Sequence, residues 1–200
     1  MSRPRTVSDA EILAAAAAGI AAVGPAHLRL AVVAEAAGLS AATLVQRFGS
    51  KRALLLHLAG RAVAQARAAA GEARAAAPSP LAAVRQVRFT LADMATTPQE
   101  MAHHLAFLQM DLTDPDFHRL ARAHAREQER QLRALLVEAV EAGELPPGDT
   151  AVRARVLLAV TSGSLLRWAI VRKGGASHWL ATDVDAVLAS WRPDRGAVPM

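Results

Sequence analysis

The apolar positions of this chain recur at helical spacing, and no segment alternates with the two-residue period of a strand. Ser8 and Glu11 match a capping box, which predicts a first helix from about residue 9 to Gly24-Pro25. We therefore expect an all-α fold of nine helices. After the first, the pattern predicts helices over residues 30–37, 41–48, 51–76, 81–95, 98–112, 115–142 and 150–172, and a last one marked by apolar residues 184–191.

Apolar residues occupy two faces of the segment 98–112. Leu105 and Leu108 share one face, and Phe107 and Met110 lie on the other. A helix that is apolar on two sides is typically buried, so we expect a core helix here. The chain is expected to form a loop over residues 173–182, and a flexible tail over 193–200.

Composition narrows the class of protein. About a quarter of the residues are alanine, aromatic residues make up 4%, and cysteine is absent. The lack of thiols excludes disulfides, a thiol nucleophile and thiolate metal sites, and it fits a reducing compartment. The apolar stretch 12–23 is mostly alanine and too short to span a bilayer, and no signal-peptide pattern precedes it. We expect a cytoplasmic protein with no membrane segment, cofactor or metal site.

Basic charge is concentrated near the amino terminus. Residues 1–52 carry six basic and three acidic side chains, a net charge of +3 out of +5 for the whole chain. A nucleic-acid interface requires such a patch, but an arginine-rich composition without any partner produces the same numbers. Charge alone does not separate these two interpretations.

The most informative segment is residues 28–52, LRLAVVAEAAGLSAATLVQRFGSKR. It reads as a helix that ends at Gly38, a tight turn, and a second helix with Ser40 as its N-cap, which is the pattern of a helix-turn-helix. Leu44 and Phe48 are four residues apart and would dock the second helix on the protein. The opposite side of that helix would then enter the DNA major groove.

The residues on that opposite side suit contact with DNA. Ala41, Ala42 and Val45 allow close approach to thymine methyl groups, and a plain solvated surface has no need of them. Gln46 can form two hydrogen bonds to adenine, and the Thr43 hydroxyl can bind a phosphate or a base edge.

Several cations surround this helix. Arg47 can bind a phosphate, and Lys51 and Arg52 begin the next helix, where a cation opposes the helix dipole unless a phosphate binds there. Arg29 begins the helix over residues 30–37 in the same way. The predicted DNA-binding residues are therefore Arg29, Ala41, Ala42, Thr43, Val45, Gln46, Arg47 and Lys51.

This segment resembles the DNA-binding domain of the TetR family of transcriptional regulators. The resemblance is close over about residues 8–58, and beyond them it rests on helix number and lengths and on a Gly163-x-x-x-x-Trp168 stretch. Family members often have a DNA-contacting aromatic residue where Val45 stands, and a Ser or Thr where Arg29 stands, so a different operator sequence is expected. The family pattern is matched by Ala34, Ala37, Gly38, Leu39, Ser40, Thr43, Leu44, Phe48, Ser50, Lys51 and Leu54.

The resemblance implies a helix-turn-helix DNA-binding domain over residues 1–52 and a ligand-binding and dimerisation domain over 53–192. It implies a homodimer formed through helices near 150–172 and 183–191, bound to a palindromic double-stranded DNA operator. The residues support the dimer independently, because the segment 152–170 is apolar with small residues in its middle. An ordinary monomer core has the same pattern. The residues that carry the pattern are Val152, Val156, Val160, Gly163, Ser164 and Ile170.

An effector site is expected in the second domain. Methionine and aromatic side chains with a few polar groups fit a mostly apolar small-molecule pocket, although each is also an ordinary core residue. Adjacent helix positions face different directions, so His103-His104 is not expected to bind a metal. The candidate lining residues are Phe89, Met94, His103, Phe107, Met110, Phe117, His124, Gln128 and Trp168.

We therefore expect a DNA-binding transcriptional regulator, a dimeric repressor that a small, mostly apolar effector releases from its operator. The alternative is a helix-turn-helix DNA-binding protein without an effector, and a filled core between residues 85 and 170 would favour it. An enzyme is not expected, because the chain has no HExxH motif and no serine nucleophile elbow, and its acidic residues are scattered.

Overall fold

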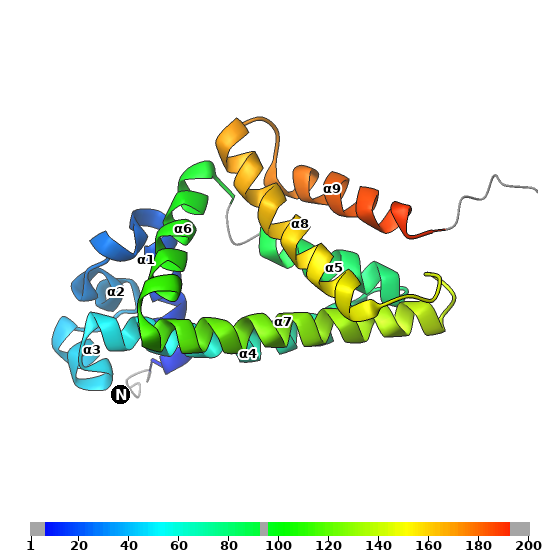
Figure 1. The fold of residues 1–200 in the computed structure, drawn as a ribbon. Coiled ribbons are helices and arrows are strands. Elements are labelled where there is room, and N and C mark those ends of the chain that lie inside the picture. The colour runs from blue at the N-terminus through cyan, green and yellow to red at the C-terminus, as the bar shows by residue number, and fades with distance from the viewer. Residues whose placement is uncertain (1–6, 93–95, 193–200) are drawn as a thin grey trace, which may run out of the picture. The chain divides into compact units, whose positions relative to one another are not determined.

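The computed structural model describes residues 7–92 and 96–192, apart from the side chains of residues 88–92. Within these ranges the chain forms nine α-helices and no strand (Figure 1), as predicted. The helices are α1 (Asp9–His27), α2 (Leu30–Ala36), α3 (Ala41–Phe48), α4 (Lys51–Ala76), α5 (Pro80–Ala92), α6 (Pro98–Thr113), α7 (Pro115–Glu141), α8 (Thr150–Val171) and α9 (Ala176–Ser190).

Side-chain caps explain why several helices begin where the sequence predicts. Ser8 and Glu11 form the predicted capping box, with Glu11 N donating to Ser8 Oγ (3.2 Å) and Ser8 N donating to Glu11 Oε2 (2.8 Å). Ser40 accepts from Thr43 N (3.1 Å) at the start of α3. Asp149 caps α8 in the same way. Each cap satisfies backbone N–H groups that have no partner within the helix.

The break predicted at Gly24-Pro25 is present inside α1. Gly24 has φ 76°, and a further helical turn runs from Pro25 to His27. Proline cannot donate to the helix ladder, and glycine adopts a positive φ without steric cost, so the two residues produce the kink together.

The beginning of the last helix differs from the prediction. Residues 173–182 are not all loop, because α9 begins at Ala176, directly after Gly175. Residues 176–182 contain neither glycine nor proline, and Leu180 is fully buried. Burial of this side chain stabilises two helical turns that the sequence pattern did not predict.

The core position predicted for the helix over residues 98–112 is also wrong. No residue of α6 is fully buried, and the side chains of Leu108 and Leu112 are 45% and 69% exposed. Phe107 and Met110 pack against a neighbouring core, so one apolar face of α6 is covered and the other is open.

The described chain forms two compact units. The first unit contains the residues up to Ala62 and Gln99–Ala123, and the second contains Val63–Pro98 and the residues from His124 onward. Helices α4 and α7 therefore each contribute residues to both units. The domain boundary predicted at residue 52 stays a prediction.

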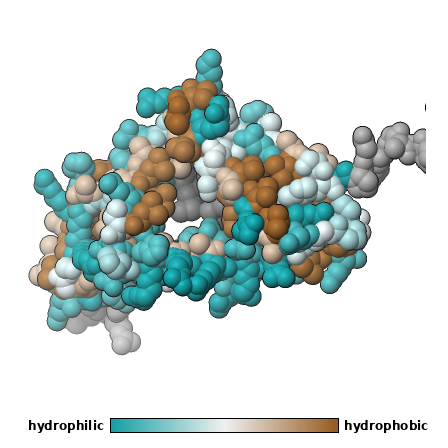
Figure 2. Space-filling view, in the orientation of Figure 1, coloured by the Kyte–Doolittle hydropathy of each residue, from teal (hydrophilic) through white to brown (hydrophobic). Residues whose placement is uncertain are grey.

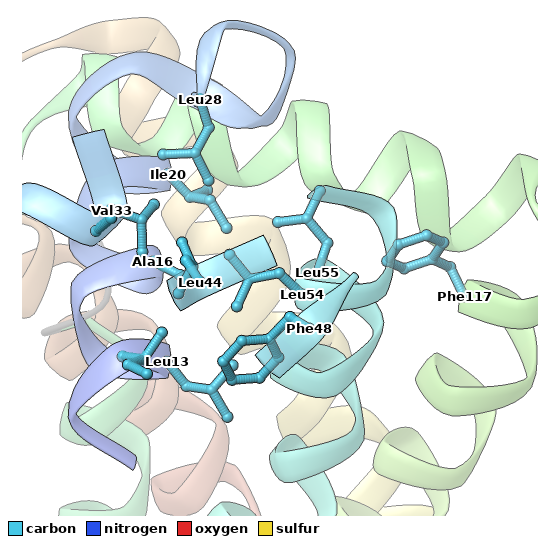
Figure 3. Close-up of a cluster of buried hydrophobic side chains, with 12 residues drawn as sticks. Leu13, Ala16, Ile20, Leu28, Val33, Leu44, Phe48, Leu54, Leu55 and Phe117 are labelled. Atoms are coloured by element: carbon cyan, nitrogen blue, oxygen red, sulfur yellow. The ribbon is translucent and has the colours of Figure 1, made fainter. Parts of the chain in front are cut away.

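A hydrophobic core holds the first unit together (Figure 3). Leu44 and Phe48 of α3 point into this core, as the sequence predicts, and Leu44 is fully buried. Phe117 of α7 belongs to the same core and is also fully buried. Helices α6 and α7 thus contribute side chains to the unit that contains the helix-turn-helix.

The second unit has its own core, with Leu135 and Leu136 of α7 and Leu180 and Leu188 of α9 fully buried. Helix α9 packs on α8 and on α5. An ion pair between Arg85 Nε and Asp185 Oδ1 (2.8 Å) joins α5 to α9.

Two of the described helices, α1 and α8, are long and apolar enough to cross a membrane by length and composition alone. Helix α1 has 19 residues, and so it is longer than the apolar stretch 12–23 on which the expectation of no span was based. In each helix 33% of the apolar window is buried inside the protein, and core helices of soluble proteins pass the same test.

Candidate nucleic-acid interface

The turn between α2 and α3 has the geometry of a helix-turn-helix. Helix α2 ends at Ala36, Gly38 follows with φ 68°, and Leu39 N donates to Ala34 O (2.8 Å) across the turn. Helices α2 and α3 pack against each other. A residue with a side chain at position 38 would be strained by the positive φ, so the sharp turn requires glycine.

The side of α3 that faces away from the core is apolar and open. Ala41, Ala42, Val45 and Gln46 are all exposed, and Val45 is 46% exposed. The Thr43 hydroxyl lies 2.8 Å from Ser40 Oγ at the amino end of the helix. Among the described residues, Gln46 has no hydrogen-bond partner, so its amide is available to a base edge.

Two of the predicted phosphate-binding cations of the helix-turn-helix already have partners. Arg47 donates to Val7 O (2.6 Å) and forms an ion pair with Asp9, which ties α3 to the start of α1. Lys51 Nζ donates to Ala26 O (2.8 Å). Both side chains would have to exchange these partners for a phosphate.

Arg29 differs from these two cations. It precedes α2 and is exposed, and its side chain makes no capping hydrogen bond. The first N–H groups of α2 therefore lack the side-chain cap that α1, α3 and α8 have. A phosphate at this position would satisfy them.

Arg52 has partners that the sequence did not reveal. Its Nη2 donates to Asp114 Oδ1 (2.9 Å) and Oδ2 (2.8 Å) and to Asp116 Oδ2 (2.9 Å), and its guanidinium lies over the Phe117 ring, 5.7 Å from the centroid. The hydrogen bond from Arg52 lowers the pKa of Asp114 below the usual range of a carboxyl. The pairing joins residues 62 apart in the chain, and no local pattern predicts it.

Four of the predicted effector-binding residues lie in the first unit. Phe117 is buried in the core of this unit, the Phe107 ring stands edge-on to it with centroids 5.8 Å apart, and Met110 packs against the same core. His103 Nδ1 lies 2.6 Å from Ala21 O. Because a carbonyl only accepts, the imidazole donates through Nδ1, and Nε2 faces Gln99 Nε2 at 3.0 Å.

Three other predicted effector-binding residues lie in the second unit. Trp168 is buried, and its indole N–H donates to Gly174 O (3.0 Å). His124 and Gln128 are half-buried on α7, and burial lowers the pKa of His124. Met94 and the side chain of Phe89 lie outside the described residues. The structure thus divides the predicted effector-binding residues between the two units, and this site stays a prediction.

A charged cluster joins α4 and α7 in the second unit. Glu127 Oε1 accepts from Arg130 Nη2 (2.6 Å), from Arg67 Nε (3.0 Å) and from Gln131 Nε2 (2.8 Å). These hydrogen bonds, the one from Arg130 above all, hold the pKa of Glu127 far below its usual range. The cluster links the two helices and surrounds the ionised Glu127 carboxylate with hydrogen-bond donors. Among the described residues, no three His, Asp or Glu side chains are grouped as metal ligands.

The outer face of α8 carries a stripe of six residues with heptad spacing. Its large members Val152, Val156, Leu166 and Ile170 are 42%, 38%, 40% and 71% exposed, and Figure 2 shows apolar side chains gathered over this helix. We call this set the α8 stripe, and its members are Val152, Val156, Ala159, Gly163, Leu166 and Ile170.

Two residues of the interface predicted on α8 lie elsewhere on the helix. Val160 is half-buried, and Ser164 is buried, with its Oγ donating to Asp183 Oδ2 at 2.5 Å. Ser164 thus faces α9, on which α8 packs within the second unit.

Comparisons with known proteins agree with this geometry. The family model for the amino-terminal domain of bacterial regulatory proteins of the tetR family matches residues 12–58, and the model for the C-terminal domain of BetI-type transcriptional repressors matches residues 80–189. A search among curated protein sequences finds no match.

Solved structures share the fold. A TetR family transcriptional regulator, PfmR from Thermus thermophilus, is 24% identical over 92% of this chain and 99% of its own, with a TM-score of 0.62. A TetR transcription regulator from Haloarcula marismortui is 16% identical over 92% and 95%, with a TM-score of 0.72. FadR from Bacillus subtilis, solved in complex with stearoyl-CoA, is 15% identical over 91% and 98%, with a TM-score of 0.67.

These regulators have the same helical architecture, and the C-terminal family model alone covers more than half of the 200 residues. The helix-turn-helix, with its open α3 face, coincides with the part of the chain that the amino-terminal family model matches. The chain therefore belongs to the TetR family of DNA-binding transcriptional regulators.

Proposed function

We propose that this regulator is a dimeric repressor that binds a palindromic operator and leaves it when a small, mostly apolar effector binds. The observation that carries the DNA contact is the outer face of α3, where Ala41, Ala42, Val45 and Gln46 are exposed together. These small side chains allow close approach to the floor of a major groove, and the Gln46 amide can read a base edge there.

The α8 stripe supports the dimer. Its residues follow one another at intervals of four, three, four, three and four, which is the spacing of a coiled-coil seam. Ala159 and Gly163 lie in the middle and allow two backbones to approach closely. Association of two copies through this stripe would remove the exposed aliphatic side chains from water, and it would place two recognition helices on successive half-sites.

The effector is the least constrained part of the proposal. The FadR structure holds stearoyl-CoA. Of the nine predicted effector-binding residues, seven lie among the described residues, and most of these seven are aromatic or apolar. Stearoyl-CoA is therefore a suitable first probe, with free coenzyme A as the control for its polar part. A protein that binds DNA but responds to no ligand would favour the alternative of a regulator without an effector.

The decisive experiment is a fluorescence-anisotropy titration of the purified chain against duplex DNA from upstream of its own gene. It is run at two salt concentrations with an excess of unrelated DNA, because phosphate contacts alone are sequence-independent and salt-sensitive. Binding that survives the competitor supports a specific operator. If the competitor abolishes binding, operators are selected from random duplexes.

Two further results of this experiment would count against the proposal. No DNA binding by a folded chain would overturn it, and so would turnover of a substrate without any operator. Light scattering at micromolar concentration tests the dimer, and a monomer that binds a single half-site would overturn the dimeric part.

A further inference from the structure

The cations of the helix-turn-helix differ in what holds them when DNA is absent. Lys51 donates to a neutral carbonyl, Ala26 O, and Arg47 pairs with Asp9 of the adjoining helix α1. Arg52 alone among these three is held by carboxylates from outside residues 1–52, at the junction of α6 and α7. This contact connects the amino end of α4 to the helix pair α6–α7 within the first unit.

Arg52 is shared between two carboxylates at this contact. One guanidinium meets the two carboxylates of Asp114 and Asp116, and all three contacts use the single nitrogen Nη2. The next cation, Arg119, reaches Asp116 only at 3.8 Å. While the carboxylates hold Arg52, its charge is compensated, and a phosphate at the amino end of α4 gains little attraction from it.

The contact is also easy to exchange. The side chains of Arg52, Asp114 and Asp116 are 50%, 30% and 51% exposed. Exposed ion pairs contribute little to stability, because water screens them and both side chains lose conformational freedom. Arg52 lies in the first turn of α4, so its long side chain can turn from the carboxylates to a phosphate at the start of that helix.

We propose that Asp114 and Asp116 compete with operator phosphate for Arg52, so that the α6–α7 turn regulates one DNA contact of each subunit. This inference rests on the proposed DNA binding and goes beyond it by naming the residue and its competitor. When the turn moves so that its carboxylates leave Arg52, the DNA interface gains a cation. When the carboxylates contact Arg52 again, the interface loses that cation.

The test compares operator affinity and its salt dependence in four proteins: the unmodified chain, R52A, the double variant D114N/D116N, and the triple variant R52A/D114N/D116N. Asparagine keeps an oxygen for the hydrogen bond that Asp114 Oδ1 accepts from Asp116 N (2.9 Å) at the start of α7. The matched control is E138Q/E141Q, which removes two surface carboxylates of α7 in the second unit, one of which pairs with Arg74. Melting curves show that each variant folds, and D116N alone replaces the double variant if that one does not fold.

We expect D114N/D116N to bind the operator about three- to tenfold more tightly than the unmodified chain, and the slope of log affinity against log salt to steepen by about 0.9 per half-site. The gain disappears in the triple variant, and the control changes neither quantity. A gain that persists without Arg52 would reveal only a general charge effect and would overturn the inference, as would unchanged binding in D114N/D116N. Failure of the unmodified chain to bind any duplex would overturn the proposed function itself.

Discussion

Helices α3 and α8 both expose apolar side chains, but they do so in different electrostatic surroundings. On α3 the exposed face is short, and Arg29, Arg47 and Lys51 are its nearby cations in the sequence. On α8 the exposed stripe runs along most of the helix, from Val152 to Ile170, and none of its members is charged.

The difference indicates two kinds of partner. Small apolar groups beside cations suit a polyanion with an apolar groove floor, where phosphates bind the rim and methyl groups meet the centre. A long uncharged stripe suits an identical stripe, because only another apolar surface removes it from water without burying unpaired charge. The predictions below use substitutions that should affect one face and spare the other.

The largest effect is expected from charges on the α8 stripe. In L166E/I170E, two carboxylates would be buried in the dimer, which costs several kcal/mol when no partner is present, roughly 2–7 kcal/mol for even a neutral polar group. We expect a folded monomer by light scattering and a loss of operator affinity of about a hundredfold or more. The control is Val137→Glu, which places a carboxylate on the exposed face of α7. A variant that stays dimeric would remove the α8 stripe from the interface.

The next effect separates the two sides of α3. Leu44 is fully buried, so Leu44→Ala should lower the free energy of unfolding by about 2–5 kcal/mol. Val45, its neighbour, is exposed, and Val45→Ala should change stability by less than about 0.5 kcal/mol while weakening operator binding. Urea unfolding followed by circular dichroism measures the first quantity and anisotropy the second. Equal destabilisation by both variants would contradict the orientation of α3.

A smaller and more selective effect is expected from Gln46→Ala. If the amide reads one base, the variant should lose about 1–3 kcal/mol of discrimination at a single operator position and keep its preference elsewhere. Titration against operators with single base-pair changes measures this. A uniform loss at all positions would show that Gln46 contacts the backbone, and dimerisation should be unaffected in either case.

Salt should distinguish the two faces without any mutation. Operator affinity should fall steeply with salt, and the dimer dissociation constant should hardly change, because the α8 stripe has no charge to screen. Lys51→Ala should make the slope of log affinity against log salt shallower by about 0.9 for each phosphate that the lysine neutralises. Sedimentation equilibrium over the same salt range provides the comparison, and a dimer that dissociates as salt rises would contradict an apolar interface.

The smallest effect concerns pH, and its sign should be opposite in the two units. Burial raises the pKa of Asp111 in the first unit from 3.8 to about 6, so folding favours the protonated acid there. The resulting penalty is absent below the unfolded pKa and complete above about pH 6, so acidification from pH 7 to pH 5 should stabilise this unit. Burial lowers the pKa of His124 in the second unit, so the same acidification should destabilise that unit.

Amide hydrogen exchange, resolved by unit, measures both pH slopes. Both side chains are partly exposed, so we expect less than about 1 kcal/mol from each. Asp111→Asn should flatten the slope in the first unit, and His124→Gln should flatten the slope in the second. Slopes of the same sign in the unmodified chain would show that other groups dominate the titration.

The sequence predicted the features that depend on neighbouring residues better than the features that depend on distant ones. Helix α3 begins and ends, and α4 begins, at the predicted residues, because Ser40, Gly49 and Ser50 act within four residues of these boundaries. The predicted start of α9 was wrong because burial of Leu180 in the core, and no strong local signal, stabilises the beginning of this helix. The expectation of a buried α6 was wrong for a related reason. Apolar periodicity shows that a face exists, but it does not show whether another element covers that face.

The sequence by itself determined the all-α fold, the helix-turn-helix and the inward and outward sides of α3, because caps, turn glycines and periodicity are local properties of a chain. Only the tertiary structure decided that Phe117 completes the core around the helix-turn-helix and that Arg52 pairs with Asp114 and Asp116. These contacts join residues about sixty positions apart. They form because packing brings complementary groups together, and nothing in the neighbouring residues marks them in advance.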